Sequence, residues 1–431
     1  MFETIKNALA SKEIRKKIFY TLLMIFIYRI GCFIPIPGIR ADAIGNLIGD
    51  SEFFQLLGIV SGGALSQGTL FALGIIPFIN AFIIMQLLTL IIPKLEKLSK
   101  EGGEEGRQKI TQITRYVAIV LAVIQAVGVL MSWKGSIRSA FGNSDAGIYG
   151  TMALMGIILV GGSTFVMWIG ERITEYGIGN GTSLIIFIGI LAGGGTALLN
   201  SFGVISANTN LLWNLFGFFV VIIVIFVFII FVDSAERRIS VQYAKQVKGN
   251  KMYGGQKTHI PIRVNASGVM PIIFASAFLM FPQMIMGLFW PTSSAYAWYS
   301  ANMGIGTWPY YVFMVLFIVF FAYFYAQIQF NPEDVARNIQ QYGGFVQGIR
   351  PGKPTCDYLK KINNRITLFG AIFLAIIAVI PTFIFQAIGQ QLGLANAFSA
   401  TGLLILVSVA LEFNTQLESQ VMMRYYKGFL K

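Results

Sequence analysis

Histidine and the familiar catalytic motifs are almost missing from this sequence of 431 residues. His259 is the only histidine, which excludes metal binding by a histidine pair and a histidine-assisted serine nucleophile within a membrane. HExxH, GxSxG and GxxxxGKS/T do not occur, and GGEEGRQK at 102–109 lacks the spacing and the preceding strand of a phosphate-binding loop. We therefore expect no enzyme, no metal and no cofactor. Any energy that the function of this chain requires must come from a partner, an ion gradient or the substrate.

Cysteine is scarce as well, with only Cys32 and Cys356 in the chain. Two cysteines in separate regions imply no disulfide framework. The start of the chain has a basic stretch, an apolar run and RIGC at 29–32, a pattern that suggests signal processing. Arg29 stands where such a signal needs an apolar residue, and no small-residue cleavage site follows. We expect this first apolar segment to be retained.

Charged residues make up only 12% of the chain, against roughly a quarter in a soluble domain. Apolar residues make up 55%, and the mean hydropathy is +0.69. A crossing helix needs roughly 20 mostly apolar residues, and near-continuous apolar runs favour helices over barrel strands. The sequence thus predicts an all-α membrane protein with ten transmembrane helices. The predicted spans are 18–34, 69–92, 116–133, 148–170, 183–199, 211–232, 268–290, 308–330, 366–388 and 397–413.

Lysine and arginine are distributed very unevenly between the predicted connections. If the N-terminus is cytoplasmic, that side carries 28 of the 32 Lys and Arg residues and the opposite side carries 3. The remaining one is Arg29, within the first span. Because cytoplasmic connections are enriched in Lys and Arg, both termini are expected in the cytosol, and an even number of spans agrees with this.

The ten spans divide into two halves of five, residues 1–200 and 201–431. Since five is odd, the two halves must have opposite orientations in the membrane. This is the arrangement of inverted repeats, whose functional site lies at the interface of the halves near the middle of the membrane. No convincing sequence repeat accompanies it, so the parity indicates opposite orientation and not common ancestry.

Two predicted cytosolic loops, 233–267 and 331–365, are far longer than simple connectors. Their cations are mixed with Gly, Pro and aromatic residues, so that Arg350 in GIRPG is expected at a defined turn. One interpretation is that they orient the chain and attract anionic lipid. The other is a docking surface for RNA phosphates or for an acidic protein partner.

A coupled solute transporter normally carries ionisable residues near the middle of the membrane. Glu171, Arg172, Asp233 and Glu412 instead lie at or near the ends of predicted spans, where charge is tolerated. Arg29 either snorkels outward or pairs within the bundle. An inverted-repeat transporter is therefore disfavoured, but it stays an alternative, as does a lipid scramblase-like structural protein.

The stretch IVSGGALSQGTLFALGIIPFINAF, residues 59–82, begins too polar to cross a bilayer and becomes apolar halfway. Its first half is either an ordinary surface loop or a re-entrant half-helix within a protein-lined cavity. Such backbone is tolerated at membrane depth only in a cavity of this kind. Small residues allow this segment to pack closely and also to leave, because it buries little apolar area. A re-entrant segment of this kind is a candidate moving plug.

Several stretches, in order along the whole chain, carry a resemblance to a known family. They are SGGALSQGTLFALGIIPFINAFIIMQLL, GRQKITQITRY, MWIGERITEYGIGNGTSLIIF, RRISVQYAK, THIPIRVN, NPEDVARN, GGFVQGIRPGKPT and LLILVSVALE. The chain resembles the SecY family, the central channel subunits of the bacterial protein translocon. The resemblance implies two five-helix halves hinged around an hourglass pore, a plug, and a lateral gate between spans two and three and spans seven and eight. Asn80 and Thr182 depart from the family pattern and affect only side-chain detail.

The resemblance also assigns functional positions. It implies a hydrophobic pore ring, a plug at about 54–66, and a polar latch across the lateral gate. The ring residues are Ile75, Ile79, Ile186, Ile190, Ile273 and Ile405. The plug residues are Phe54, Gly62, Gly63, Ala64, Leu65 and Ser66, and the latch residues are Gln125 and Asn265. From the residues alone, lipid contact or core packing is the default for any one isoleucine, although i, i+4 pairs do share a helix face.

The function implied is a channel that passes unfolded secretory polypeptides across the membrane and releases apolar segments sideways into lipid. The implied partners are SecE- and SecG-type small subunits, the ATPase SecA, the ribosome, and the secretory and membrane protein substrates. The docking residues are Arg237, Arg238, Lys245, Arg263 and Arg350. The implied location is the bacterial plasma membrane.

Overall fold

The computed structural model describes residues 11–39, 61–100, 102–137, 145–207, 211–243, 245–248, 251–254, 257–290, 293–304, 307–389 and 400–428, together with Leu9 and Gly58. Most of these residues are helical. The helices are α2 (Lys12–Gly31), α5 (Ile76–Ile91), α6 (Pro93–Lys100), α7 (Gly103–Ser132), α8 (Asp145–Tyr176), α9 (Gly181–Ala207), α10 (Leu212–Asp233), α11 (Met270–Phe289), α12 (Ser294–Asn302), α13 (Trp308–Gln329), α14 (Pro332–Gln341), α15 (Lys353–Gly389) and α16 (Ala400–Gly428).

Helices long and apolar enough to cross a membrane account for most of the predicted spans. Within the described ranges seven helices qualify alone, and α5 with α6 makes an eighth if this pair, bent by 103°, is one span. The first and tenth predicted spans fall on α2 and α16. The predicted fold class is confirmed: this is a helical multi-pass membrane protein, and its helices are consistent with ten spans.

Two predicted spans begin at other residues than the helices that contain them, each for a physical reason. The second span begins at Ile76 and not at 69, because residues 61–75 form consecutive turns with Gly68 and Gly74 at φ 59° and 55°. The ninth helix, α15, begins at Lys353, inside the predicted loop 331–365. Its first turns are polar, and a search for apolar runs detects only the part of a helix that lies in lipid.

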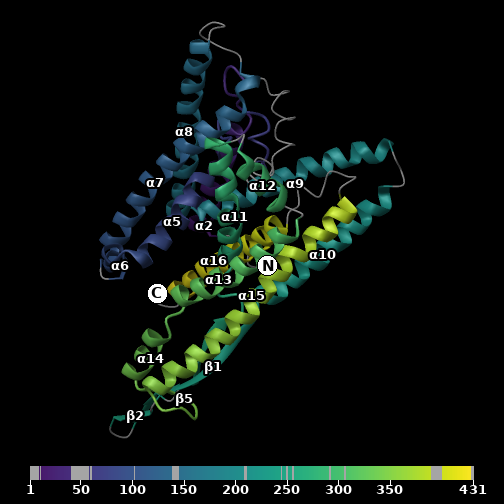
Figure 1. The fold of residues 1–431 in the computed structure, drawn as a ribbon. Helices are drawn as coiled ribbons and strands as arrows, with labels where there is room; N and C mark the ends of the chain where they lie inside the picture. The colour runs from purple at the N-terminus through teal and green to yellow at the C-terminus, as the bar shows by residue number, and fades with distance from the viewer. Residues whose placement is uncertain are drawn as a thin grey trace.

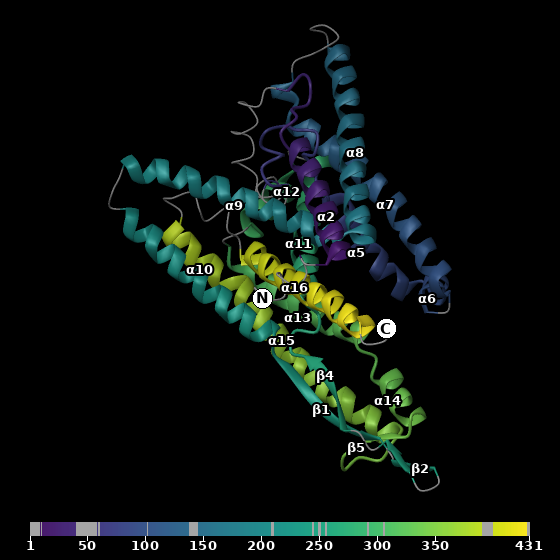
Figure 2. The ribbon, with the colours of Figure 1, turned by 180° about the vertical axis from the view of Figure 1, so that it is seen from behind.

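The helices form two groups that the central helices connect. Figures 1 and 2 show α2 and α5 to α8 on one side of the molecule and α10 and α15 on the other, with α11, α13 and α16 between them. Helix α16, from the second half of the chain, packs on α9 from the first half. The predicted division at 200/201 falls within α9 (Gly181–Ala207), near its C-terminal end.

The two predicted cytosolic loops fold together as a small unit at one end of α15 (Figure 1), which we name the cytosolic unit after that prediction. Strand β1 (Glu236–Tyr243) pairs antiparallel with β4 (Lys257–Arg263) on one side and with β5 (Gly344–Val346) on the other. Strands β2 (Lys245–Lys248) and β3 (Lys251–Gly254) extend the hairpin. These segments are therefore not simple loops.

This cytosolic unit has a hydrophobic core of its own. Side chains alternate along β1, so that Ile239 and Val241 point to one face, where they meet Ile262 of β4. Helix α14 and the start of α15 cover that face with Ile339 and Leu359, both buried. Since the covering helix α15 continues into the membrane part, the unit is held firmly to the spans.

Close helix contact in the first half depends on small residues. A Cβ atom built on Gly162 of α8 would overlap the backbone carbonyl of Leu70, whereas one built on the neighbouring Gly161 meets nothing within 4 Å. The backbone of the turn segment 61–75 therefore packs directly on α8. Ser163 reinforces this contact by donating a hydrogen bond of 3.0 Å from its hydroxyl to the carbonyl of Gly74.

Gly162→Ala is expected to lower the midpoint of thermal unfolding, because the added methyl displaces the Leu70 backbone, and overpacking of this kind costs about 1–3 kcal/mol. Gly161→Ala, one residue earlier in the same helix, is the matched control and should leave the midpoint unchanged or slightly raised. Thermal unfolding of the purified protein measures both. Equal midpoints for the two variants would show that the contact is not tight.

Candidate functional site

The six predicted ring isoleucines come together in one hydrophobic cluster. Four of them, Ile75, Ile186, Ile190 and Ile405, are buried within it, and the other two, Ile79 and Ile273, are partly buried and pack against it. They belong to α5 and the residue before it, to α9, to α11 and to α16. Both halves of the chain thus contribute to a single apolar cluster, the ring cluster.

Local sequence explains how these side chains converge. Helix α5 begins at Ile76 with Pro77 in its first turn, a position that suits proline because no intrahelical hydrogen bond is lost. Ile75 and Ile79 therefore lie near one another at the start of this helix. In α9, Ile186 and Ile190 are one turn apart and face the same side, with exposed fractions of 6% and 2%.

The segment 61–75 lies against the ring cluster and is buried, which excludes an ordinary surface loop. Ser61 and Leu65 are fully buried, and Ala64 belongs to the ring cluster itself. One interpretation of the sequence predicted a re-entrant half-helix here. The structure instead shows consecutive turns. Of the predicted plug, the described residues are Gly58 and 61–66; Phe54 lies outside them.

Hydrogen bonds within the segment satisfy its buried backbone. The carbonyl of Gly58 accepts from the backbone N–H of Gly63 at 2.9 Å and from the Ser61 hydroxyl at 3.2 Å. The carbonyl of Ala64 accepts from both the backbone and the hydroxyl of Thr69, at 3.1 and 3.0 Å. These bonds stay within residues 58–69, whereas Gly68 and Leu70 also bond to Ile36 and Ile34 after α2, each at 2.9 Å.

Gly62 is a second point of close approach between this segment and the helices. Its φ is +64°, and a Cβ atom there would lie 2.9 Å from Nη1 of Arg29 and 3.0 Å from the Cα atom of Gly189. Gly189 stands between the two ring isoleucines of α9. The segment therefore rests on the ring cluster through a glycine–glycine contact that has no room for a side chain.

Arg29 faces this contact and does not simply snorkel away. Its guanidinium carbon lies 5.3 Å from the ring centroid of Phe33. Within the described part of the chain, its Nη1 atom is buried and has no hydrogen-bond partner. A cation is thus held next to Gly62 at the edge of the ring cluster.

The predicted latch residues Gln125 and Asn265 are both buried, with exposed fractions of 4% and 6%. Gln125 lies on α7, and Asn265 lies in the turn before α11. Helices α7 and α11 touch. The structure does not join the two amides, however: their Oε1 and Oδ1 atoms have no hydrogen-bond partner among the described residues. The Asn265 amide nitrogen donates instead to Oδ1 of Asp233, at 2.7 Å.

A polar contact that the sequence did not predict crosses the same seam. Gln86 of α5 donates from Nε2 to the hydroxyl of Tyr325 of α13, at 3.2 Å. These helices are the second and eighth predicted spans, one from each half. The available signal was Gln86 itself, because the amide of a glutamine in a mostly apolar span needs a hydrogen-bond partner in lipid.

Around this seam the halves are joined mainly by apolar packing. Ile83 of α5 is buried in a second cluster, the seam cluster, with Ile272 and Phe274 of α11 and with Ile318 and Phe321 of α13. Ile79 contacts both this cluster and the ring cluster. Among the described residues, this seam consists of apolar contacts and the neutral Gln86–Tyr325 hydrogen bond, with no ion pair across it.

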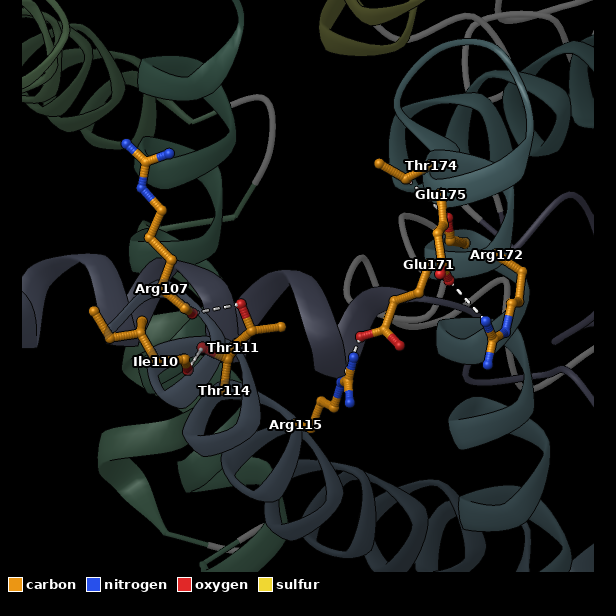
Figure 3. A network of polar contacts seen from close by, with 10 residues as sticks. Arg107, Ile110, Thr111, Thr114, Arg115, Glu171, Arg172, Thr174 and Glu175 are labelled. Carbon is orange, nitrogen blue, oxygen red and sulfur yellow. Dashed lines mark hydrogen bonds and ion pairs between the residues drawn. The ribbon is translucent and has the colours of Figure 1, made fainter. Parts of the chain in front are cut away.

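Ionic contacts are found away from the seam, at one end of α7 and α8. Arg115 of α7 donates from Nε to Oε1 of Glu171 of α8 at 2.6 Å, and Arg172 pairs with Glu175 at 2.7 Å (Figure 3). Arg107 of α7 points away from this group in the same view. The pair Arg115–Glu171 fixes two helices of the first half to each other.

The predicted docking residues gather on the cytosolic unit. Arg238 and Arg263 lie on the outer face of the β1–β4 pair, where Arg238 is paired with Glu236 at 2.7 Å. Arg237 lies on the opposite face, across from Ile262, and Lys245 lies in β2.

Arg350 is exposed in a turn between β5 and α15. Gly348 and Gly352 flank it with φ of 81° and 99°, and its carbonyl accepts a hydrogen bond of 2.8 Å from the Thr355 hydroxyl. The expected turn is therefore present.

Comparison with known proteins gives the family. The SecY family model matches residues 69–414. The chain belongs to the SecY family. A protein translocase subunit SecY from Streptomyces scabiei is 41% identical over 443 residues, with the whole of both chains covered. Another from Bacillus subtilis (strain 168) is 40% identical over 438 residues with the same coverage.

Solved structures of similar fold agree with this assignment. The structure of a protein-conducting channel has a TM-score of 0.62 with this chain at 20% identity. The alignment covers 94% of this chain and 91% of the channel chain. Sec61 in a canine ribosome–channel complex has a TM-score of 0.58 at 18% identity, with the same coverage. Membership of the family confirms the predicted function class: the chain is a membrane channel for polypeptides and not an enzyme.

The contact between Gln86 and Tyr325 is expected to couple the two halves energetically. In a double-mutant cycle, Gln86→Leu and Tyr325→Phe should show an interaction of about 0.6 kcal/mol, and no more than about 1.7, as for other interhelical hydrogen bonds in membranes. Tyr323→Phe is the control, since the Tyr323 hydroxyl donates to Asn364 in the same half. Additive effects of Gln86→Leu and Tyr325→Phe on thermal unfolding would contradict the contact.

Proposed function

We propose that the ring cluster is the constriction of the channel and that segment 54–66 is its plug. The supporting observation is the position of Gly62 and Ala64 against isoleucines drawn from both halves of the chain. A narrow apolar constriction expels water, and so it limits ion flow even when a polypeptide or the plug does not fill it. Plug and ring then act as separate seals.

We further propose that the seam between α5 and α7 on one side and α11 and α13 on the other is a lateral gate. Gln125 and Asn265 lie at this seam, and Gln86 with Tyr325 adds a polar contact across it. A substrate segment in the pore then partitions between water and lipid. A central Leu contributes about −0.5 kcal/mol and a central Asp or Lys costs about 3 kcal/mol, so the channel sorts segments by hydrophobicity without covalent chemistry.

Force for translocation comes from partners in this proposal. The ATPase SecA or a translating ribosome docks on the cytosolic unit at Arg237, Arg238, Lys245, Arg263 and Arg350, and a SecE-type subunit braces the halves, with a SecG-type subunit beside them. Anionic lipid neutralises part of the remaining positive charge. The chain resides in the bacterial plasma membrane in this proposal. Its lysine and arginine distribution supports an orientation with both termini in the cytosol.

Substitution at Gly62 tests the two seals. Gly62→Ala is expected to raise the resting ion conductance in planar bilayers, since the methyl has no room between Arg29 and Gly189. Gly63→Ala is the matched control: its φ is also positive, at +86°, but a Cβ there comes no closer than 3.9 Å to any side chain. Both variants bear the backbone strain, and only the first has the clash.

Ile79→Asn with Ile190→Asn should wet the ring and add to the leak of Gly62→Ala, because dewetting requires apolar walls. A conductance equal to wild type in both Gly62→Ala and the ring variant would refute the assignment of plug and pore. The same preparations should be assayed for translocation of an unfolded polypeptide, which reports whether the channel functions at all.

Charge reversal tests the docking residue. Arg350→Glu should reduce partner-driven translocation at least about tenfold, the effect of losing roughly 1.4 kcal/mol at a contact, while thermal stability stays unchanged because the side chain is exposed. Lys94→Glu on α6, an exposed cation outside the cytosolic unit, is the control for net charge. Translocation by Arg350→Glu at the wild-type rate would remove this residue from the docking surface.

A further inference from the structure

Asp233 makes two short hydrogen bonds, one to the turn before α11 and one to α16. It is the last residue of α10. Its Oδ1 atom accepts from the Asn265 amide at 2.7 Å, and its Oδ2 atom accepts from the Ser408 hydroxyl at 2.6 Å. Both oxygens of one carboxylate are thus used, each on a different structural element.

The two donors lie on elements that matter for different parts of the site. Asn265 is in the turn before α11, which forms one side of the proposed gate. Ser408 is in the first third of α16, one turn after Leu404. On α16, Leu404 and Val407 are buried in the seam cluster, whereas Ile405 and Val409 are buried in the ring cluster. Helix α16 is therefore in contact with both clusters, and Asp233 adds a polar link between this helix and the turn before α11.

The carboxylate is bound by neutral donors. None of the salt bridges found among the described residues includes Asp233. Hydrogen bonds to an ionised carboxylate are about twice as strong as neutral ones, so Asp233 fixes both donors more firmly than an amide or hydroxyl would. An ionisable residue at the boundary of the membrane that is held in this way is a candidate for a functional role.

We infer that Asp233 is a positioning residue that couples the lateral gate to the pore ring. It fixes the Asn265 amide, and with it the start of α11, to the helix that carries Ile405. When the seam between α7 and α11 opens, α16 must either move with the gate turn or give up one of the two bonds. The carboxylate therefore sets how readily the gate opens and links that opening to the ring. This inference rests on the gate and ring assignments proposed above.

The test uses the assembled translocon in proteoliposomes and a graded series of test segments with increasing leucine content. Asp233→Leu removes both acceptors and is expected to lower the leucine content at which a segment enters lipid by about one residue. Asp233→Asn keeps the shape and can still accept from Asn265, so its shift should be smaller. Asn265→Leu should shift the threshold as far as Asp233→Leu.

Combining the substitutions separates positioning from a general loss of stability. Since Asp233 acts through Asn265, the variant with both Asp233→Leu and Asn265→Leu should have the same threshold as Asn265→Leu alone. Glu412→Leu, which removes an exposed carboxylate of α16, is the matched control and should leave the threshold unchanged. A threshold in the double variant that shifts by the sum of the single shifts would overturn the inference, as would no shift in Asp233→Leu.

Two further measurements keep the result interpretable. Thermal unfolding of each variant shows whether it is folded; if Asp233→Leu does not fold, Asp233→Asn and Ser408→Ala carry the test, and both must shift the threshold. A wild-type channel that admits no test segment into lipid at any leucine content would refute the proposed gate itself. A normal wild-type threshold that is insensitive to Asp233 would refute only the coupling.

Discussion

Lipid offers no hydrogen-bond partner to a peptide group, and this constraint governs the rest of the structure. Every backbone segment at membrane depth must be helical or enclosed by protein. The turns of residues 61–75 meet the second condition, since Ser61 and Leu65 are fully buried and the carbonyls of Gly58 and Ala64 are hydrogen-bonded within the segment. Enclosure requires a cavity between helix groups, and a cavity between two halves is also what a pore requires. One constraint therefore accounts for both the irregular segment and its place against the ring cluster.

The contacts between the halves have a consistent chemistry. Among the described residues, the ion pair Arg115–Glu171 joins two helices of the same half, whereas the seam between the halves contains apolar side chains and the neutral pair Gln86–Tyr325. Separation of a charge pair in lipid would be costly, but separation of apolar surfaces is nearly neutral there, because lipid replaces the lost dispersion contacts. Opening the boundary between the halves would thus cost less than separating α7 from α8.

Much of the architecture follows from the sequence, and the exceptions are instructive. Apolar runs locate the spans, and i, i+4 spacing puts Ile186 and Ile190 on one face, but only the family resemblance selects the six ring residues from the many isoleucines. Hydropathy does not detect the polar start of α15 or the strands of the cytosolic unit, whose alternation is short. The roles of Gln86 and Asp233 depend on contacts with residues 239 and 175 positions away, which local patterns do not contain.

Helix α15 has a mechanical consequence. It runs for 37 residues without interruption from Lys353, three residues after Arg350, to Gly389. A helix of that length is about 55 Å long. Its first turns form the core of the cytosolic unit with Leu359, and its later turns pack on α10 and α13. It therefore links the exposed turn directly to the membrane helices. A load applied at that turn would be carried along the helix as far as Pro381, where a proline inside a helix favours a bend.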